Sequence, residues 1–149
     1  MIKSLHARHH QLANQERQME FLNNGIFKDG KLPTFKNKIE PLGHFPLRPG
    51  KIEIFQVNIG YMCNQVCKHC HVDAGPDRKE IMTRDTMQVC LDVLERTQIK
   101  TLDITGGAPE MNPDFRWFVS EAHKRGVKEI IVRSNLTIIT ANPKYNDLP

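Results

Sequence analysis

Three cysteines within eight residues restrict the fold of this chain more than any other feature of its sequence. Cys63, Cys67 and Cys70 follow the spacing C-x3-C-x2-C, directly after the apolar run 54–59. Side chains so close in sequence converge only where the backbone loops around a common point, and a metal can supply that point. Thiolates select zinc, copper(I) or iron–sulfur clusters. A [4Fe–4S] cluster normally takes four cysteines, so a loop that offers three leaves one iron open.

The same residues allow three other interpretations. Cys67 to His71 also satisfies C-x-x-C-H, the attachment signature of c-type haem, although that use requires export and residues 1–24 show no apolar signal segment. A structural zinc ion held by the three cysteines and His71 is chemically sound. A thioredoxin-like dithiol would use only Cys67 and Cys70.

Composition limits the class of protein. The chain has 149 residues, 39% hydrophobic and 26% charged, which is ordinary for one soluble globular domain. Its formal charge of +4 comes from scattered basic residues, so nucleic-acid binding is not supported. No apolar run approaches the ~18 residues that a membrane span requires. Four cysteines without an export signal favour a reducing cytoplasm.

The N-terminal third carries weaker signals than the rest. Apolar residues recur every seven positions and predict a helix over about 4–23. Residues 28–50 contain four prolines and are expected to form an extended connector. We therefore divide the chain into an N-terminal helix and connector, residues 1–50, and a main domain, residues 51–149.

In the main domain, strand and helix patterns alternate. Runs rich in β-branched residues predict strands over 53–59, 101–105 and 128–133. Apolar stripes at i, i+3, i+4 and i+7 predict helices between them, over about 84–97 and 113–125. This alternation with short links is typical of parallel βαβ units. The predicted fold class is therefore α/β with a parallel sheet.

Single residues refine the two helices. Thr83 is the expected N-cap of the first helix, and Asn112 followed by Pro113 is the expected start of the second. Cys90 lies within the apolar stripe of the first helix. Because a buried free cysteine behaves as a small hydrophobe, we expect Cys90 in the core rather than as a fourth metal ligand.

A polar motif follows each predicted strand. The cysteine loop follows the first strand, Gly106 and Gly107 follow the second, and Ser134 and Asn135 follow the third. In parallel α/β folds the chemistry gathers at the carboxyl ends of the strands. We therefore expect the three motifs to lie on one rim of the sheet.

The cysteine loop resembles that of the radical S-adenosylmethionine (radical SAM) enzymes. The wider strings Phe-Gln-Val-Asn-Ile-Gly, residues 55–60, and His-Val-Asp-Ala-Gly-Pro, residues 71–76, are similar to a narrower branch, the arsenosugar-biosynthesis radical SAM proteins. The resemblance implies that Cys63, Cys67 and Cys70 ligate three irons of a [4Fe–4S] cluster. It also implies that the open iron binds S-adenosylmethionine, which an electron from the cluster cleaves to a 5′-deoxyadenosyl radical.

By the same resemblance, the glycine pair 106–107 is similar to the family's glycine-glycine-glutamate motif. Its backbone, with Ala108 and Pro109, would hold the methionyl end of the cofactor. Ala108 stands where the acidic residue usually does and Glu110 comes two places later, so the resemblance carries over the backbone contribution.

Three further cofactor-binding residues are candidates. His69 occupies the position where the family often places an aromatic residue near the adenine. Ser134 and Asn135 could reach the cofactor or substrate, and Asn135 could as easily cap the turn that follows.

Length sets a limit on the barrel. A closed eight-stranded barrel takes ~250 residues, whereas residues 53–149 accommodate about three strand–helix units. The family resemblance implies an open core of about twice that number, so we expect the first half of a radical SAM partial barrel, from the N-terminal part of a longer enzyme. The implied partners are an electron donor such as flavodoxin or ferredoxin and a small-molecule substrate, a methylated arsenical that receives the 5′-deoxyadenosyl group.

Overall fold

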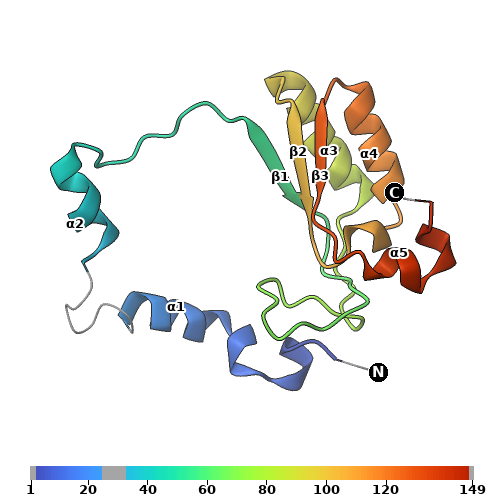
Figure 1. The fold of residues 1–149 in the computed structure, drawn as a ribbon, viewed down its shortest axis with the longest axis horizontal. Coiled ribbons are helices and arrows are strands. Elements are labelled where there is room, and N and C mark those ends of the chain that lie inside the picture. Colours follow the sequence, from blue (N-terminus) through green and yellow to red (C-terminus); the bar gives the residue numbers. More distant parts are fainter. Residues whose placement is uncertain (1–2, 25–32, 148–149) are drawn as a thin grey trace. The chain divides into compact units, whose positions relative to one another are not determined.

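The computed structural model describes residues 3–24 and 33–147. The chain forms two compact units: one contains the residues up to Arg8 and those from Ile52 onward, and the other is His9–Lys51. The first unit contains the sheet and the cysteine loop (Figure 1). Within the described ranges, no helix is long and apolar enough to cross a membrane.

The N-terminal region differs from the single helix and extended connector that the sequence predicts. Two 3-10 turns precede helix α1 (Gln15–Asn24). The expected helix over 4–23 is wrong in its first half, because His9 adopts a left-handed backbone (φ 52°) that a right-handed helix cannot contain. The expected connector includes a short helix α2 (Phe35–Ile39), whose N-cap Thr34 accepts a hydrogen bond from a backbone N–H of its first turn.

Three parallel strands form one sheet in the order β1-β2-β3. They are β1 (Ile54–Asn58), β2 (Thr101–Thr105) and β3 (Glu129–Val132). Each pair of neighbours is parallel, so the three carboxyl ends lie at the same edge of the sheet. The predicted α/β class with parallel βαβ units is confirmed, and each predicted strand matches an observed one to within a residue.

Helices α3 (Arg84–Thr97) and α4 (Phe115–Lys124) connect the strands and pack on one face of the sheet (Figure 1). Alternate residues of the strands point toward these helices, as the pleat of a sheet requires. The buried core between the layers comprises Val57, Ile59, Met87, Leu91, Leu94, Ile99, Leu102, Ile104, Phe115, Phe118, Ala122 and Val127. Cys90 packs against this core, as expected.

The opposite face of the sheet has a buried ionic group at its centre. Asp103 is 3% exposed, and its carboxylate accepts hydrogen bonds from Gln56 Nε2 at 2.7 Å and from Arg133 Nε and Nη2, both at 2.9 Å. The Arg133 guanidinium and, to a smaller extent, the Gln56 amide hold the pKa of Asp103 below its usual range, although burial acts in the opposite direction. Asp103 is therefore ionised and paired at neutral pH.

The starts of the two helices illustrate one correct prediction and one error. Thr83 is the N-cap of α3, and its hydroxyl accepts the Thr86 N–H. Asn112, by contrast, does not cap α4, which begins at Phe115 after Asp114. The Asn112 side chain is instead drawn into the protein, where its amide donates to the carbonyls of Ile59 and Met82, each at 3.0 Å.

Candidate cofactor site at the carboxyl ends of the strands

The cysteine loop lies beyond the carboxyl ends of β1 and β2, beside the turn that follows β2 (Figure 1). Backbone hydrogen bonds hold the two ends of this loop together: Cys63 N donates to Gly75 O at 3.2 Å, and Gly75 N donates to Tyr61 O at 3.1 Å. The glycine turn adds two more, from Gly107 N to Gly60 O and from Ala108 N to Met62 O, each at 2.9 Å. The first two predicted motifs are therefore in direct contact.

Gly107 is the point of closest approach between the turn and the loop. A Cβ atom at Gly107 would lie 2.9 Å from the Cβ atoms of both Cys63 and Ala74. It would also overlap the carbonyl oxygen of Met62. Only a residue without a side chain fits between these atoms, so the glycine is required by packing against the first cysteine.

The three cysteines have different surroundings. All are free thiols; Cys63 is buried, whereas Cys67 and Cys70 are half-buried. Cys63 Sγ accepts hydrogen bonds from Gln65 N and Asn135 Nδ2, each at 3.4 Å, and Cys70 Sγ accepts one from Ala74 N at 3.3 Å. Burial raises the pKa of the Cys63 thiol, and the two N–H donors partly oppose this effect by stabilising the thiolate.

The donor set, three thiols, is the ligand type that iron–sulfur clusters take. Among residues 3–24 and 33–147, no three or more His, Cys, Asp or Glu side chains are close enough to bind one ion. A structural zinc site needs four ligands around one ion, whereas three cysteines of a cluster loop would each bind a different iron and need not meet at one point. His71, the fourth ligand of the zinc interpretation, is exposed.

The remaining predicted residues divide into two groups. Ala108 and Pro109 are buried beside the glycine turn, and Asn135 reaches Cys63 from the end of β3. His69 lies exposed in the loop. Ser134 accepts the Leu136 N–H through its hydroxyl at 3.0 Å, which shapes the turn after β3. The structure thus brings the cysteine loop, the glycine turn and Asn135 together, as expected from parallel strands.

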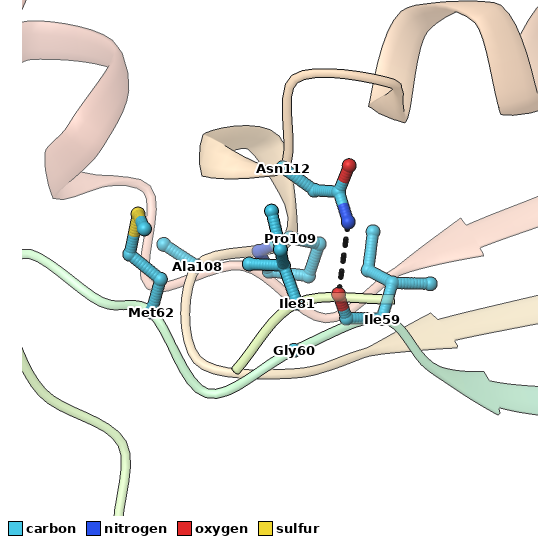
Figure 2. A pocket seen from close by; sticks show the side chains of 7 residues that line it. All are labelled: Ile59, Gly60, Met62, Ile81, Ala108, Pro109 and Asn112. Atoms are coloured by element: carbon cyan, nitrogen blue, oxygen red, sulfur yellow. Dashed lines mark hydrogen bonds between the residues drawn. The ribbon is translucent and has the colours of Figure 1, made fainter. Parts of the chain in front are cut away.

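A small apolar hollow lies behind the glycine turn (Figure 2). Met62, Ile81, Ala108 and Pro109 line it together with Ile59, Gly60 and Asn112, whose amide bonds the Ile59 carbonyl. The hollow has essentially no room for a molecule the size of water. Its side chains therefore pack against one another behind the turn.

Glu110 has an unusual environment for a carboxylate. It is 6% exposed, and its Oε2 atom is buried without a hydrogen-bond partner among the residues that the structure describes. An unsatisfied buried carboxylate oxygen is costly.

Sequence reasoning assigned no role to the acidic residues after the cysteines. In the structure, Asp77 accepts the Ser4 N–H and hydroxyl at 2.7 and 2.8 Å, and Asp73 accepts the N–H groups of Leu5 and His6 at 2.7 and 2.8 Å. We call these four hydrogen bonds the N-terminal anchor. Burial acts to raise the pKa of Asp77, but the hydrogen bonds from Ser4 outweigh it and lower the pKa.

A cysteine loop after the first strand of a parallel sheet, in contact with a glycine turn after the second, is the arrangement that the resemblance to radical SAM enzymes predicts. Comparison with known proteins supports this superfamily, although no family model matches the chain. The relatives are radical SAM enzymes, a class that uses a [4Fe–4S] cluster and S-adenosylmethionine.

Two kinds of relative stand out. The chain is 41% identical to mycofactocin maturase MftC of Mycobacterium ulcerans over 71 residues. These aligned residues cover 46% of this chain and 19% of the relative. It is 24% identical to a probable GTP 3′,8-cyclase of Sulfolobus acidocaldarius over 85 residues. These aligned residues cover 57% of this chain and 27% of the relative. The chain therefore spans roughly a fifth to a quarter of the curated relatives that it matches.

Proposed function

We propose that this chain carries the cluster-binding part of a radical SAM enzyme, with Cys63, Cys67 and Cys70 as ligands of a [4Fe–4S] cluster. The packing of Gly107 directly against Cys63 is the observation that carries the proposal, because it joins the two motifs that hold the cofactors. When bound, the cluster would supply the electron that cleaves S-adenosylmethionine to methionine and a 5′-deoxyadenosyl radical.

The residues of the chain have distinct tasks in this proposal. The loop supplies three sulfur ligands, and the buried position of Cys63 fixes one of them against the sheet. The backbone of the glycine turn, with Ala108 and Pro109, borders the methionyl end of the cofactor. Glu110 follows this turn with an unpartnered buried oxygen, and we assign it the negative charge that faces the cofactor's amino group. His69 stays a candidate for a contact to the adenine, and Ser134 and Asn135 stay candidates for contacts to the cofactor or substrate.

The proposed substrate is a methylated arsenical, to which the 5′-deoxyadenosyl group is joined in arsenosugar biosynthesis. The resemblance of residues 55–60 and 71–76 to that branch supports this choice. The enzyme would draw electrons from a donor such as flavodoxin or ferredoxin, in a reducing cytoplasm that keeps the free thiols and the cluster intact. Another small molecule or a peptide is the competing substrate class, because the relatives reported above are named as a GTP 3′,8-cyclase and a mycofactocin maturase and not as arsenosugar enzymes.

The first experiment measures iron, sulfide and zinc after anaerobic reconstitution, with EPR spectra of the reduced protein with and without S-adenosylmethionine. We expect about four irons per chain and a spectrum that changes on addition of the cofactor. Cys67→Ala should lose the cluster. Cys90→Ala is the matched control, because Cys90 packs against the core away from the loop and should retain full iron content. Stoichiometric zinc that depends on His71 would overturn the proposal.

Two further measurements address the cofactor and the substrate. Glu110→Gln should weaken binding of S-adenosylmethionine, measured by calorimetry, while leaving the iron content unchanged. For the substrate, the natural full-length enzyme is incubated with the cofactor, a reductant and a methylated arsenical, and products are identified by mass spectrometry. An arsenical carrying a 5′-deoxyadenosyl group supports the arsenosugar assignment. Free 5′-deoxyadenosine with an unchanged arsenical argues for the competing class.

A further inference from the structure

Asn135, at the end of β3, is held in a closed ring of side-chain hydrogen bonds. Its Nδ2 donates to Asn64 Oδ1 at 3.1 Å, and Asn64 Nδ2 donates to Thr137 Oγ1 at 2.9 Å. Thr137 Oγ1 closes the ring by donating to Asn135 Oδ1 at 2.8 Å. From this ring, Asn135 Nδ2 also reaches Cys63 Sγ at 3.4 Å.

The hydrogen bonds fix which end of the Asn135 amide faces the cysteine. The backbone N–H of Thr137 lies 2.9 Å from Asn135 Oδ1. Because a backbone N–H can only donate, the atom opposite it must be the oxygen. The NH2 group must then face Cys63. Asn135 therefore presents an N–H donor, and not a carbonyl oxygen, to the sulfur.

The turn that positions Asn135 is strained at the next residue. Leu136 has a left-handed backbone (φ 60°), which is unfavourable for a residue with a side chain. Its side chain is 64% exposed, so burial of the leucine does not offset the strain. The hydrogen bonds of Asn135 and Ser134 across the turn do so instead.

The three cysteines of the loop do not receive equal numbers of N–H donors. Cys63 accepts one from the Gln65 backbone and one from Asn135, whereas Cys70 accepts a single backbone donor. For Cys67, the described contact is from its own thiol to the Gln65 side chain at 4.0 Å. Among the described residues of the loop, the side-chain N–H···S hydrogen bond is therefore the one from Asn135 to Cys63, which is the most buried of the three cysteines.

We propose that Asn135 is a positioning residue that sets the reduction potential of the cluster through its hydrogen bond to Cys63, an inference that rests on the function proposed above. Hydrogen bonds to the ligand sulfurs are one of the factors that tune the potential of a protein-bound cluster. An N–H donor stabilises negative charge on the thiolate, and the cluster carries one more negative charge after reduction. The donor therefore favours the reduced state and raises the potential.

The test is a redox titration of the reconstituted protein, monitored by EPR in the absence of S-adenosylmethionine. Asn135→Ser can still accept the Thr137 N–H through its hydroxyl, as serine does in similar turns, but is too short to reach Cys63. It should lower the equilibrium constant for reduction about tenfold, equivalent to about 59 mV for a one-electron couple. Asn135→Ala provides a second variant without the donor and should shift the potential in the same direction.

Thr137→Val is the matched control. It removes the hydroxyl from the ring but keeps the backbone N–H that orients Asn135. The equilibrium constant for reduction should therefore stay within about twofold of the wild-type value. A wild-type potential in both Asn135 variants, with full iron content, would overturn the inference and leave the proposed function standing. Absence of an iron–sulfur cluster from the wild-type protein would overturn both.

Discussion

The contact between Gly107 and Cys63 leads to a prediction that joins packing to cofactor binding. In Gly107→Ala, the new methyl group would lie 2.9 Å from two Cβ atoms, those of Cys63 and Ala74, and would overlap a carbonyl oxygen. Carbon atoms pack best at roughly 3.5–4.0 Å, so each Cβ contact is short by at least about 0.6 Å. None of the three neighbours can turn away, because they are backbone or Cβ atoms.

The expected cost follows from this crowding. Inserting a methyl group into a packed region typically costs about 1–3 kcal/mol. The overlapped oxygen belongs to Met62, which also accepts the Ala108 N–H at 2.9 Å, and weakening that bond adds about 1 kcal/mol. We therefore expect the free energy of unfolding to fall by about 3 kcal/mol. Iron content after reconstitution should fall as well, since Cys63 is among the neighbours that must shift to make room for the methyl group.

Urea unfolding and iron analysis measure the two effects. Gly50→Ala is the matched control, because a Cβ atom at Gly50 has no neighbour within 4 Å; it should be neutral or stabilising by up to about 1 kcal/mol. If Gly107→Ala unfolded at the wild-type urea concentration and bound iron fully, the turn would not pack against the first cysteine, and the reasoning would be refuted.

Three further predictions concern side chains that hold the loop and the sheet. Asn112→Ala should lower the free energy of unfolding in urea by about 2 kcal/mol, because two carbonyls lose a buried donor; a neutral result would contradict this role. Asp77→Asn should speed hydrogen exchange at the Ser4 amide, which loses its charged acceptor; unchanged exchange would argue against the N-terminal anchor. Because Arg133 holds the pKa of Asp103 below its ordinary value of 3.8, this carboxylate contributes stability above that pH, which is lost as the pH falls through the lower, folded-state pKa. Asp103→Asn should therefore flatten the loss of thermal stability in acid, and an equally steep loss in both proteins would exclude Asp103 as its source.

The secondary structure of the main domain could be predicted because its signals are local. The apolar stripe of α3 and the Thr83 cap lie within the segment that they specify, and the observed helix, Arg84–Thr97, has the predicted bounds. Asn112 shows where local reasoning fails. Its position before Pro113 is typical of a helix start, but two carbonyls 30 and 53 residues away compete for its amide. No local pattern records that competition.

The site was predictable to the extent that topology determines it. Parallel strands bring their carboxyl ends together, so the meeting of the cysteine loop, the glycine turn and Asn135 follows from the order of elements. The N-terminal anchor does not follow from topology. It joins residues 67–73 positions apart, and Ser4 and Leu5 carry no turn or strand signal that would indicate burial. The first half of the expected helix over 4–23 failed because Ser4, Leu5 and His6 make these long-range hydrogen bonds and His9 adopts a left-handed backbone.

The contacts of the cysteine loop also explain why this segment can hold a shape before any cofactor binds. The turn after β2 closes one side through Gly107, the turn after β3 reaches Cys63 through Asn135, and the N-terminal anchor ties Asp73 and Asp77 on the far side of the cysteines. By contrast, Lys68 and His69, between the second and third cysteines, are exposed. The fixed part of the loop is therefore Cys63 and the segment after Cys70, and the two residues between Cys67 and Cys70 are exposed.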